Sequence, residues 1–305
     1  MVVGGFFWWV CALLVAPSQA LALEVVVSIK PLHALAAAVM GEQGRPGVLI
    51  QGSGSPHTYT LRPSEARALE RADLILWGGE ELETFLVRPL EHLPKKAMVV
   101  PLLRTEGLIR LPTRAGGAWE EEDHETHDHQ EEHGVMDPHV WLDPRNAKIM
   151  AVAIARSLSR VDPAHGEDYR KNASDLGQRL DGLDQELAQA LAPVRERHYI
   201  VFHDAYQYLE HRYGLGTVGS IMVHPDRTPG VKRIREIGQR LRDTHAVCLF
   251  TEPQFSRRLA ATVAESHPVR IGTLDPLGAA LPEGPEFYFQ LLRELARSLL
   301  ACLSP

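Results

Sequence analysis

Histidine and carboxylate side chains, the groups that most often bind metal ions in proteins, are concentrated in residues 120–133 of this chain. The sequence there is EEEDHETHDHQEEH, with four histidines and eight carboxylates in fourteen residues. The histidines are His124, His127, His129 and His133. A further histidine, His139, follows closely in the segment DPH. Because neutral imidazole is the commonest metal ligand, this region indicates metal binding as the first function to test.

Three other candidate ligands come from distant parts of the chain. His57 lies in GSGSPHTYTLRPS, His203 in HYIVFHDAY and Asp275 in RIGTLDPLG. Each follows or ends a predicted strand, whereas His139 precedes a predicted helix. In open α/β sheets, ligands collect beyond the carboxyl ends of the strands, so two facing lobes would bring these loops to one cleft. Three imidazoles and one carboxylate form a four-coordinate set that suits Zn²⁺.

The spacing of these four residues is a weak signal by itself, because no two of them are close enough in sequence to form a local metal motif. A single histidine at a strand end is more often a hydrogen-bonded structural residue. The segments SPH, DPH and LDP nevertheless place His57, His139 and Asp275 beside proline. Proline fixes φ and lowers the entropy lost on ordering a loop, which favours preformed ligand loops.

The elements that must position these residues alternate between strand and helix. In the first half, strands are predicted at residues 24–29, 48–51, 73–77 and 97–101, and helices at 31–40, 63–71, 81–93 and 146–161. In the second half, strands are predicted at residues 199–202, 217–222, 247–251 and 269–274, and helices at 205–213, 231–243, 255–266 and 285–303. Such alternation predicts parallel sheets covered by helices on both faces.

The repeated alternation predicts an α/β protein of two similar lobes, each a mostly parallel sheet flanked by helices, joined by one long helix. The metal site would lie in the cleft between the lobes. The N-terminal lobe spans residues 23–161, the linking helix 162–192 and the C-terminal lobe 193–305. Within the first lobe, residues 116–135 lose all periodicity and are polar, which predicts a mobile loop rich in histidine and acid.

The net charge of −7 is local to residues 120–133, since that stretch holds eight carboxylates and no lysine or arginine. The rest of the chain carries a net charge of +1. An acidic patch on a nearly neutral protein favours cations as partners and argues against nucleic acid.

The amino-terminal residues have the pattern of a signal peptide. Residues 6–16 are the apolar run FFWWVCALLVA, and an A-x-A pattern ends at Ala22. Cleavage after Ala22, removing residues 1–22, and export are therefore expected. The alternative is a short membrane anchor, but about 18 apolar residues are normally needed to span a bilayer.

Two cysteines, Cys248 and Cys302, lie outside that segment. In an exported protein an even pair most simply forms a disulfide, because the bacterial periplasm is oxidising. It would close a loop of 54 residues, for which the chain-entropy model gives about 4 kcal/mol. The alternative is two buried free thiols.

Five segments in order along the chain resemble the motif set of a known family. They are SPHTYTLRPSEARAL, DPHVWLDP, VFHDAYQYL, FTEPQF and GTLDPLG. They look like those of the periplasmic zinc-binding proteins that feed ABC transporters, the ZnuA group of metal solute-binding proteins. The resemblance covers nearly all of the chain after residue 22. It implies a periplasmic receptor that captures Zn²⁺ and delivers it to a membrane permease, without catalysis; we expect a monomer.

The resemblance also implies roles for individual residues. His57, His139 and His203 would be the zinc ligands, and Asp275 matches the position of a carboxylate that binds metal in manganese-type relatives and lies near it in zinc-type ones. The third histidine favours zinc, because a carboxylate replaces it in manganese members. Pro56 stands where some zinc members have an acidic residue, which leaves the fourth ligand open between Asp275 and water. The acid and histidine run and the cysteine pair also resemble features of zinc members.

Other functions remain as alternatives. One is a manganese receptor of the same fold. Another is a zinc hydrolase, since three protein ligands with an open position also describe a catalytic site. The chain has no HExxH, and Glu252 in FTEP is the acid at a strand end that would serve as the general base. Residues 120–133 would either collect zinc or form a solvated acidic linker.

Overall fold

Two parallel four-stranded sheets form the framework of the computed structural model, which describes residues 23–114, 135–222, 229–265 and 267–305. The first sheet has the order β2-β1-β3-β4, with β1 at Val25–Val27, β2 at Gly47–Val48, β3 at Leu74–Trp77 and β4 at Met98–Pro101. The second has the order β6-β5-β7-β8, with β5 at His198–His203, β6 at Gly216–Met222, β7 at Cys248–Thr251 and β8 at Arg270–Thr273. The matching strand orders confirm two similar α/β lobes.

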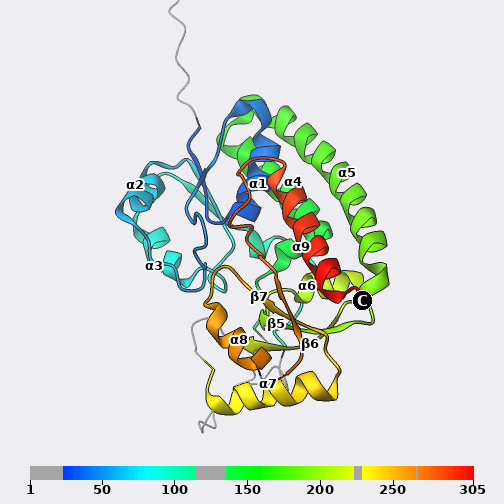
Figure 1. The fold of residues 1–305 in the computed structure, drawn as a ribbon. Coiled ribbons are helices and arrows are strands. Elements are labelled where there is room, and N and C mark those ends of the chain that lie inside the picture. Colours follow the sequence, from blue (N-terminus) through cyan, green and yellow to red (C-terminus); the bar gives the residue numbers. More distant parts are fainter. Residues whose placement is uncertain (1–22, 115–134, 223–228, 266) are drawn as a thin grey trace, which may run out of the picture.

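Helices cover both sheets (Figure 1). Those of the first half are α1 (Lys30–Met40), α2 (Pro63–Arg71), α3 (Thr84–His92) and α4 (Pro144–Val161). Those of the second half are α6 (Gln207–Tyr213), α7 (Val231–Asp243), α8 (Arg257–Glu265) and α9 (Phe287–Leu303). The 3₁₀ turns include η1 (Gly41–Gln43), η2 (Leu102–Arg104), η4 (Val140–Leu142), η5 (Pro163–His165) and η6 (Ala192–Val194). Among the described residues, none of the helices is both long and apolar enough to cross a bilayer.

The long helix of the sequence prediction is α5 (Gly166–Leu191), which runs down one side of the molecule beside α9 in Figure 1. Its apolar residues spaced by three, four and seven are all buried; they are Tyr169, Leu176, Leu180, Leu183 and Leu187. The helix begins later than predicted because η5 comes first. The carboxylate of Asp162 fixes that start by accepting hydrogen bonds from His165 Nδ1 and the Tyr169 hydroxyl, both at 2.7 Å.

The C-terminal helix α9 connects the two lobes. It packs against α1 of the first lobe, against the linking helix α5 and against β8 of the second lobe. The Tyr288 hydroxyl donates to the carbonyl of Trp141 at 2.6 Å, and buried Lys30 of α1 donates to the carbonyls of Ala279 and Leu281 at 3.0 and 3.1 Å. One apolar core therefore extends from the first lobe into the second, where a second, smaller apolar cluster also lies.

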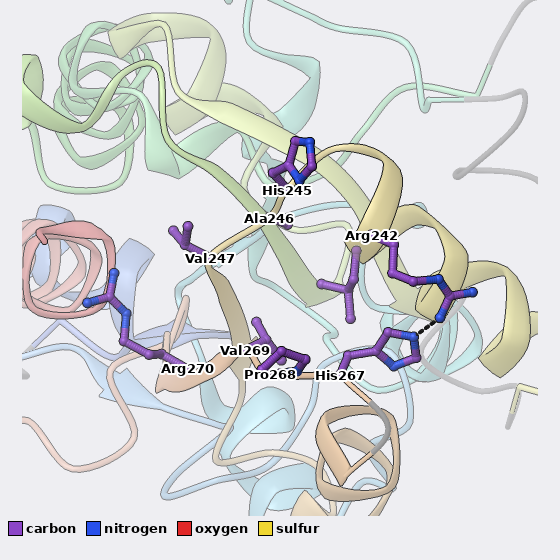
Figure 2. A pocket seen from close by; sticks show the side chains of 9 residues that line it. Arg242, His245, Ala246, Val247, His267, Pro268, Val269 and Arg270 are labelled. Carbon is purple, nitrogen blue, oxygen red and sulfur yellow. Dashed lines mark hydrogen bonds between the residues drawn. The ribbon is translucent and has the colours of Figure 1, made fainter.

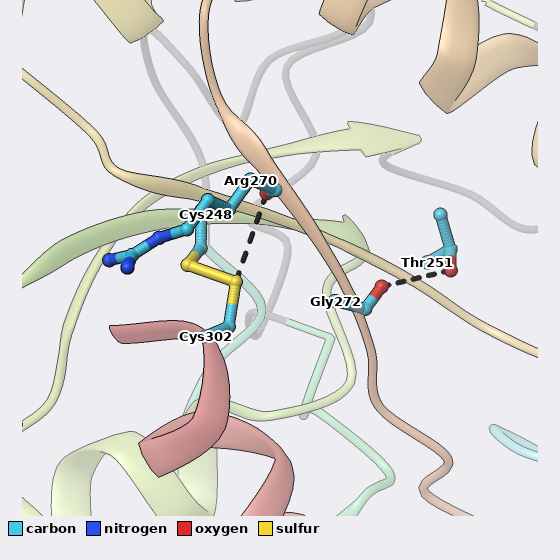
Figure 3. Close-up of a disulfide and its surroundings, with 5 residues drawn as sticks. All are labelled: Cys248, Thr251, Arg270, Gly272 and Cys302. Carbon is cyan, nitrogen blue, oxygen red and sulfur yellow. Dashed lines mark hydrogen bonds between the residues drawn. A yellow bond between two sulfur atoms is a disulfide. The ribbon is translucent and has the colours of Figure 1, made fainter. Parts of the chain in front are cut away.

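The predicted disulfide between Cys248 and Cys302 is present, with the two Cα atoms 6.1 Å apart. Figure 3 shows that it joins the start of β7 to the last turn of α9. Gly272 of β8 passes close by: a Cβ there would lie 2.5 Å from the Phe250 ring and 3.3 Å from the Cys302 Cβ. The helix, the bridge and the sheet are thus in direct contact.

Removing the disulfide is expected to destabilise the fold. In the chain-entropy model, a bridge that closes 54 residues contributes about 4 kcal/mol to the free energy of unfolding. We expect the Cys248→Ala/Cys302→Ala double variant to unfold at a clearly lower denaturant concentration than the oxidised protein. The reduced unaltered protein is the matched control. An unchanged midpoint in both would contradict a stabilising role.

Candidate metal centre

Three imidazole rings from distant parts of the chain meet between the lobes. The Nε2 atom of His139 lies 3.3 Å from Nε2 of His57 and 3.4 Å from Nε2 of His203. The three ligand atoms all lie within 4.8 Å of one another, and this is the single group of three or more such ligands found among the described residues. Four atoms placed tetrahedrally at zinc–nitrogen distances are about 3.3–3.4 Å apart. The spacing around His139 therefore fits one tetrahedral metal ion.

His57 is presented by a tight turn. The strand pairing of the first sheet continues past β2, since the N–H groups of Leu49 and Ile50 donate to the carbonyls of Val27 and Ser28, both at 2.9 Å. The chain then turns over residues 55–58, where the Thr58 N–H donates to the Ser55 carbonyl at 3.2 Å. Proline favours the second position of such a turn, which Pro56 occupies, so the SPH motif sets the ligand loop.

His139 is held by the carboxylate two residues before it. Asp137 Oδ1 accepts hydrogen bonds from the backbone N–H of His139 at 2.9 Å and from its ring Nδ1 at 2.7 Å. Both side chains are buried. The bond to Nδ1 places a proton on that nitrogen and leaves Nε2 free to bind a metal. The Trp141 ring packs against the imidazole, with 5.3 Å between the ring centroids.

His203 is held in the same way from a neighbouring strand. It ends β5, and its Nδ1 donates to Glu252 Oε1 at 2.7 Å, directly after β7. Because β5 and β7 are paired, parallel neighbours, their carboxyl ends lie side by side and the two residues meet. The exposed fractions of the two side chains are 5% and 1%. A buried carboxylate that orients a ligating histidine also raises its basicity.

Burial and neighbouring charges set the protonation of the centre. Burial lowers the pKa of His139 well below its ordinary value, and the charge of His203 lowers it further. Burial also lowers the pKa of His203, but the charge of Glu252 and its hydrogen bond outweigh this effect and raise the pKa overall. Burial raises the pKa of Asp137 to about 7, opposed mainly by the N–H of His139. His139 is thus neutral and ready to bind, whereas His203 retains a proton more readily.

Asp275, one of the two fourth ligands left open by the sequence, is not part of this group of three histidines. Its Oδ1 accepts hydrogen bonds from Gln254 Nε2 at 2.8 Å and from the N–H groups of Leu277 and Gly278 at 3.1 and 3.0 Å. Its Oδ2 accepts from the Ala279 N–H at 2.6 Å. The carboxylate therefore stabilises the turn after β8. In the same turn, the carbonyl of Pro276 accepts a hydrogen bond from the indole N–H of Trp141 at 2.9 Å.

The space at the three histidines is small. The cavity that they line with Trp141 and Phe255 has a volume of about 10 Å³, which is room for about one water-sized particle. Such a cavity suits a single ion.

A larger cavity of about 670 Å³ lies elsewhere in the second lobe. Its lining includes Val247 and Arg270, at the amino ends of β7 and β8, opposite the edge that carries His203. Figure 2 shows the Arg242 guanidinium in contact with the His267 ring, while His245 and Arg270 point away from one another. Apart from this one contact the basic side chains do not converge, so the cavity lacks a group of three ligands like that of the histidines.

Two of the site residues were not predicted in their observed roles. Asp137 was quoted as part of DPH but not as the partner of His139, although a carboxylate two residues before a ligand is a usable signal. Glu252 was considered as a general base, but its Oε1 accepts the hydrogen bond of His203. The histidines of the loop, His124, His127, His129 and His133, lie outside the described residues.

Known proteins resemble this chain in sequence and in fold. A family model described as ZnuA, zinc-uptake complex component A, periplasmic, matches residues 25–302. The chain is 46% identical to the high-affinity zinc uptake system protein ZnuA of Brucella suis over 92% of this chain and 91% of that protein. It is 34% identical to the ZnuA of Yersinia pestis, over 95% and 94%. A crystal structure of ZnuA superimposes with a TM-score of 0.79 at 25% identity, covering 93% of this chain and all of the other. The chain belongs to the ZnuA family.

Proposed function

We propose that the chain is an exported receptor that binds Zn²⁺ between its two lobes and delivers it to the membrane permease of an ABC transporter. The observation that carries this proposal is the meeting of three Nε2 atoms at 3.3 and 3.4 Å around His139. Glu252 and Asp137 orient two of the three rings. The relatives named as zinc uptake proteins support the assignment of zinc as the cargo.

His57, His139 and His203 would supply three of the four ligands, and a water molecule the fourth. Asp275 is the alternative fourth ligand, but its oxygens accept three hydrogen bonds from backbone N–H groups of the turn after β8 and one from Gln254. If the carboxylate moved to bind a metal ion, the N–H groups of Leu277, Gly278 and Ala279 would lose their hydrogen-bond acceptor. Three protein nitrogens and a water form a complete tetrahedral zinc site.

Zinc is preferred over manganese in this proposal because of the donor atoms. Imidazole suits Zn²⁺, whereas Mn²⁺ prefers carboxylate and water oxygens. Competition calorimetry with both metals tests the choice. We expect Zn²⁺ to displace bound Mn²⁺ at equal concentrations, and displacement of zinc by manganese would identify a manganese receptor instead.

The receptor performs no chemistry in this proposal. A hydrolase needs a free general base beside the metal-bound water and a pocket for its substrate. Glu252 is engaged by His203, and the cavity of about 10 Å³ admits little more than an ion.

The remaining organisation is also proposed on the basis of the sequence. Residues 1–22 would be removed on export to the periplasm, and the mature protein would act as a monomer. Residues 23–161 and 193–305 would form the lobes and 162–192 the link.

The histidines of residues 116–135 would bind further zinc weakly and pass it to the centre. Deleting residues 117–133, which keeps the backbone hydrogen bond between Thr113 and Val135, should then lower zinc stoichiometry to one; an unchanged stoichiometry and uptake would contradict this role.

Zinc affinity is expected to fall as the pH is lowered. Each imidazole must be neutral to bind metal, so protons compete with zinc at low pH. The pKa of His203 is raised by Glu252, so this ring takes up a proton first and zinc must displace it. Below that pKa the apparent affinity should fall about tenfold per pH unit. Competition with a fluorescent chelator between about pH 7.5 and 5.5 measures this slope, and a flat profile would count against histidine ligation.

A further inference from the structure

Gln254 lines the same small cavity as the three histidines. It follows β7, two residues after Glu252, and its side chain is partly buried. One end of the amide is held, because Nε2 donates to Asp275 Oδ1 at 2.8 Å. At the other end, Oε1 is buried and has no hydrogen-bond partner among the described residues. A buried amide oxygen without a donor is unfavourable, so a donor from outside the protein is expected at this position.

The turn after β8 determines which end of the Gln254 amide faces Asp275. The Asp275 carboxylate accepts hydrogen bonds from three backbone N–H groups of residues 277–279. A carboxylate is an acceptor only, so the amide nitrogen of Gln254 must face it and the amide oxygen must point the other way. The described residues that line the cavity include Gln254 but not Asp275. The oxygen is therefore the polar end of Gln254 on the side of the cavity.

The cavity has room for the proposed fourth ligand and little else. Its volume of about 10 Å³ holds about one water-sized particle. A zinc ion bonded to three imidazole nitrogens at about 2.0–2.1 Å lies among them, so this space is what remains for the water. A metal-bound water has two protons to donate. Two residues that line the cavity have a buried oxygen without a hydrogen-bond partner in the described part of the chain, Gln254 at Oε1 and Glu252 at Oε2. Donors and acceptors therefore match in number.

We propose that Gln254 is a positioning residue whose Oε1 holds the zinc-bound water. This inference rests on the proposed zinc site at His57, His139 and His203. The amide oxygen accepts one hydrogen bond from the water, while the hydrogen bond to Asp275 keeps the amide from turning over. A water held in this way completes the tetrahedral set of donors, and a group that fixes a ligand from behind strengthens metal binding. Asp275 then supports the centre without binding the ion.

The Gln254→Met variant tests this role, because it keeps the length of the side chain and removes the amide. We expect zinc affinity, measured by competition with a chelator, to fall by about tenfold. Gln207→Met is the matched control. Gln207 is the first residue of α6, its Oε1 is also buried without a partner among the described residues, and it does not line the cavity. Its replacement should leave zinc affinity unchanged. Denaturant midpoints show whether both variants are folded.

Crystal structures of the zinc-loaded protein and of its Gln254→Met variant provide a readout that a purely structural role would not change. In the unaltered protein we expect a water bonded to zinc and about 2.5–3.0 Å from Gln254 Oε1. In the variant this water should shift or be lost. A zinc-bound water out of reach of Gln254, direct bonding of Oε1 to zinc, or equal zinc affinities of the folded Gln254→Met and Gln207→Met proteins would overturn the inference. Failure of the zinc site itself is recognised separately, since zinc would then lie away from the three histidines.

Discussion

Replacing His139 by alanine is expected to abolish tight zinc binding. His139 is the middle of the three imidazoles, with its Nε2 at 3.3 and 3.4 Å from the other two, so its loss leaves two separated ligands and an open cavity. Removing a partner that only orients a ligand weakens metal binding by 10–100-fold, and removing a ligand should cost more than about 100-fold. Isothermal titration with a competing chelator measures the change.

His33→Ala is the matched control for this substitution. His33 is as buried as His139, at 6% against 5% exposed, and its Nε2 is hydrogen-bonded to the Pro46 carbonyl at 3.0 Å, away from the group. Its replacement should leave a comparable cavity and an unchanged zinc affinity. Equal zinc affinities for the two folded variants would show that His139 is not a ligand.

Replacing Glu252 by glutamine is expected to have the second largest effect. The amide can still accept a hydrogen bond from His203 Nδ1, but it lacks the charge that raises the pKa and basicity of the ring. We expect zinc affinity near neutral pH to fall by about 10–100-fold. The pH dependence should also become shallower, because His203 then holds its proton less firmly. Zinc affinity measured for this variant and for the unaltered protein at about pH 7.5 and 5.5 tests both the loss of affinity and the shallower pH dependence.

The Asp275→Asn variant tests whether Asp275 is the fourth metal ligand, and its effect is compared with that of the Glu252→Gln variant, which changes a residue that orients a ligand. Asp275 also follows a strand of the second sheet, but its oxygens accept from Gln254 and from backbone N–H groups. Its replacement should reduce stability more than zinc affinity. If instead zinc affinity fell as far as in the Glu252 variant while the fold stayed intact, Asp275 and not water would complete the site.

Much of the fold followed from periodicity. The alternation of buried strands with helices of apolar spacing predicted both sheets, and the spacing in α5 predicted its buried face. The packing of α9 against α1 and α5 was not predicted. The apolar pattern of a helix shows that it has a buried side but not which lobe covers it. Element ends also shifted: β2 is short, although pairing continues through Leu49 and Ile50.

The meeting of the three histidines was anticipated from strand ends and neighbouring prolines together with the family resemblance, and the structure brings them together. Their partners could not be anticipated, since Glu252 reaches His203 only through the pairing of β5 with β7. Asp275 was placed among the ligands because a carboxylate at a strand end has the right chemistry. The hydrogen bonds that hold its carboxylate depend on the backbone conformation of residues 277–279, which directs three N–H groups toward it, and this conformation could not be predicted from the sequence.

The most direct test is a crystal structure of the zinc-loaded protein with anomalous scattering recorded at the zinc absorption edge. We expect one strong peak in the cavity between the lobes, at about 2.0–2.1 Å from the Nε2 atoms of His57, His139 and His203. The Nδ1 contacts to Asp137 and Glu252 should persist. A peak bonded to other residues, or no peak among these three nitrogens at full zinc occupancy, would contradict the proposed metal centre.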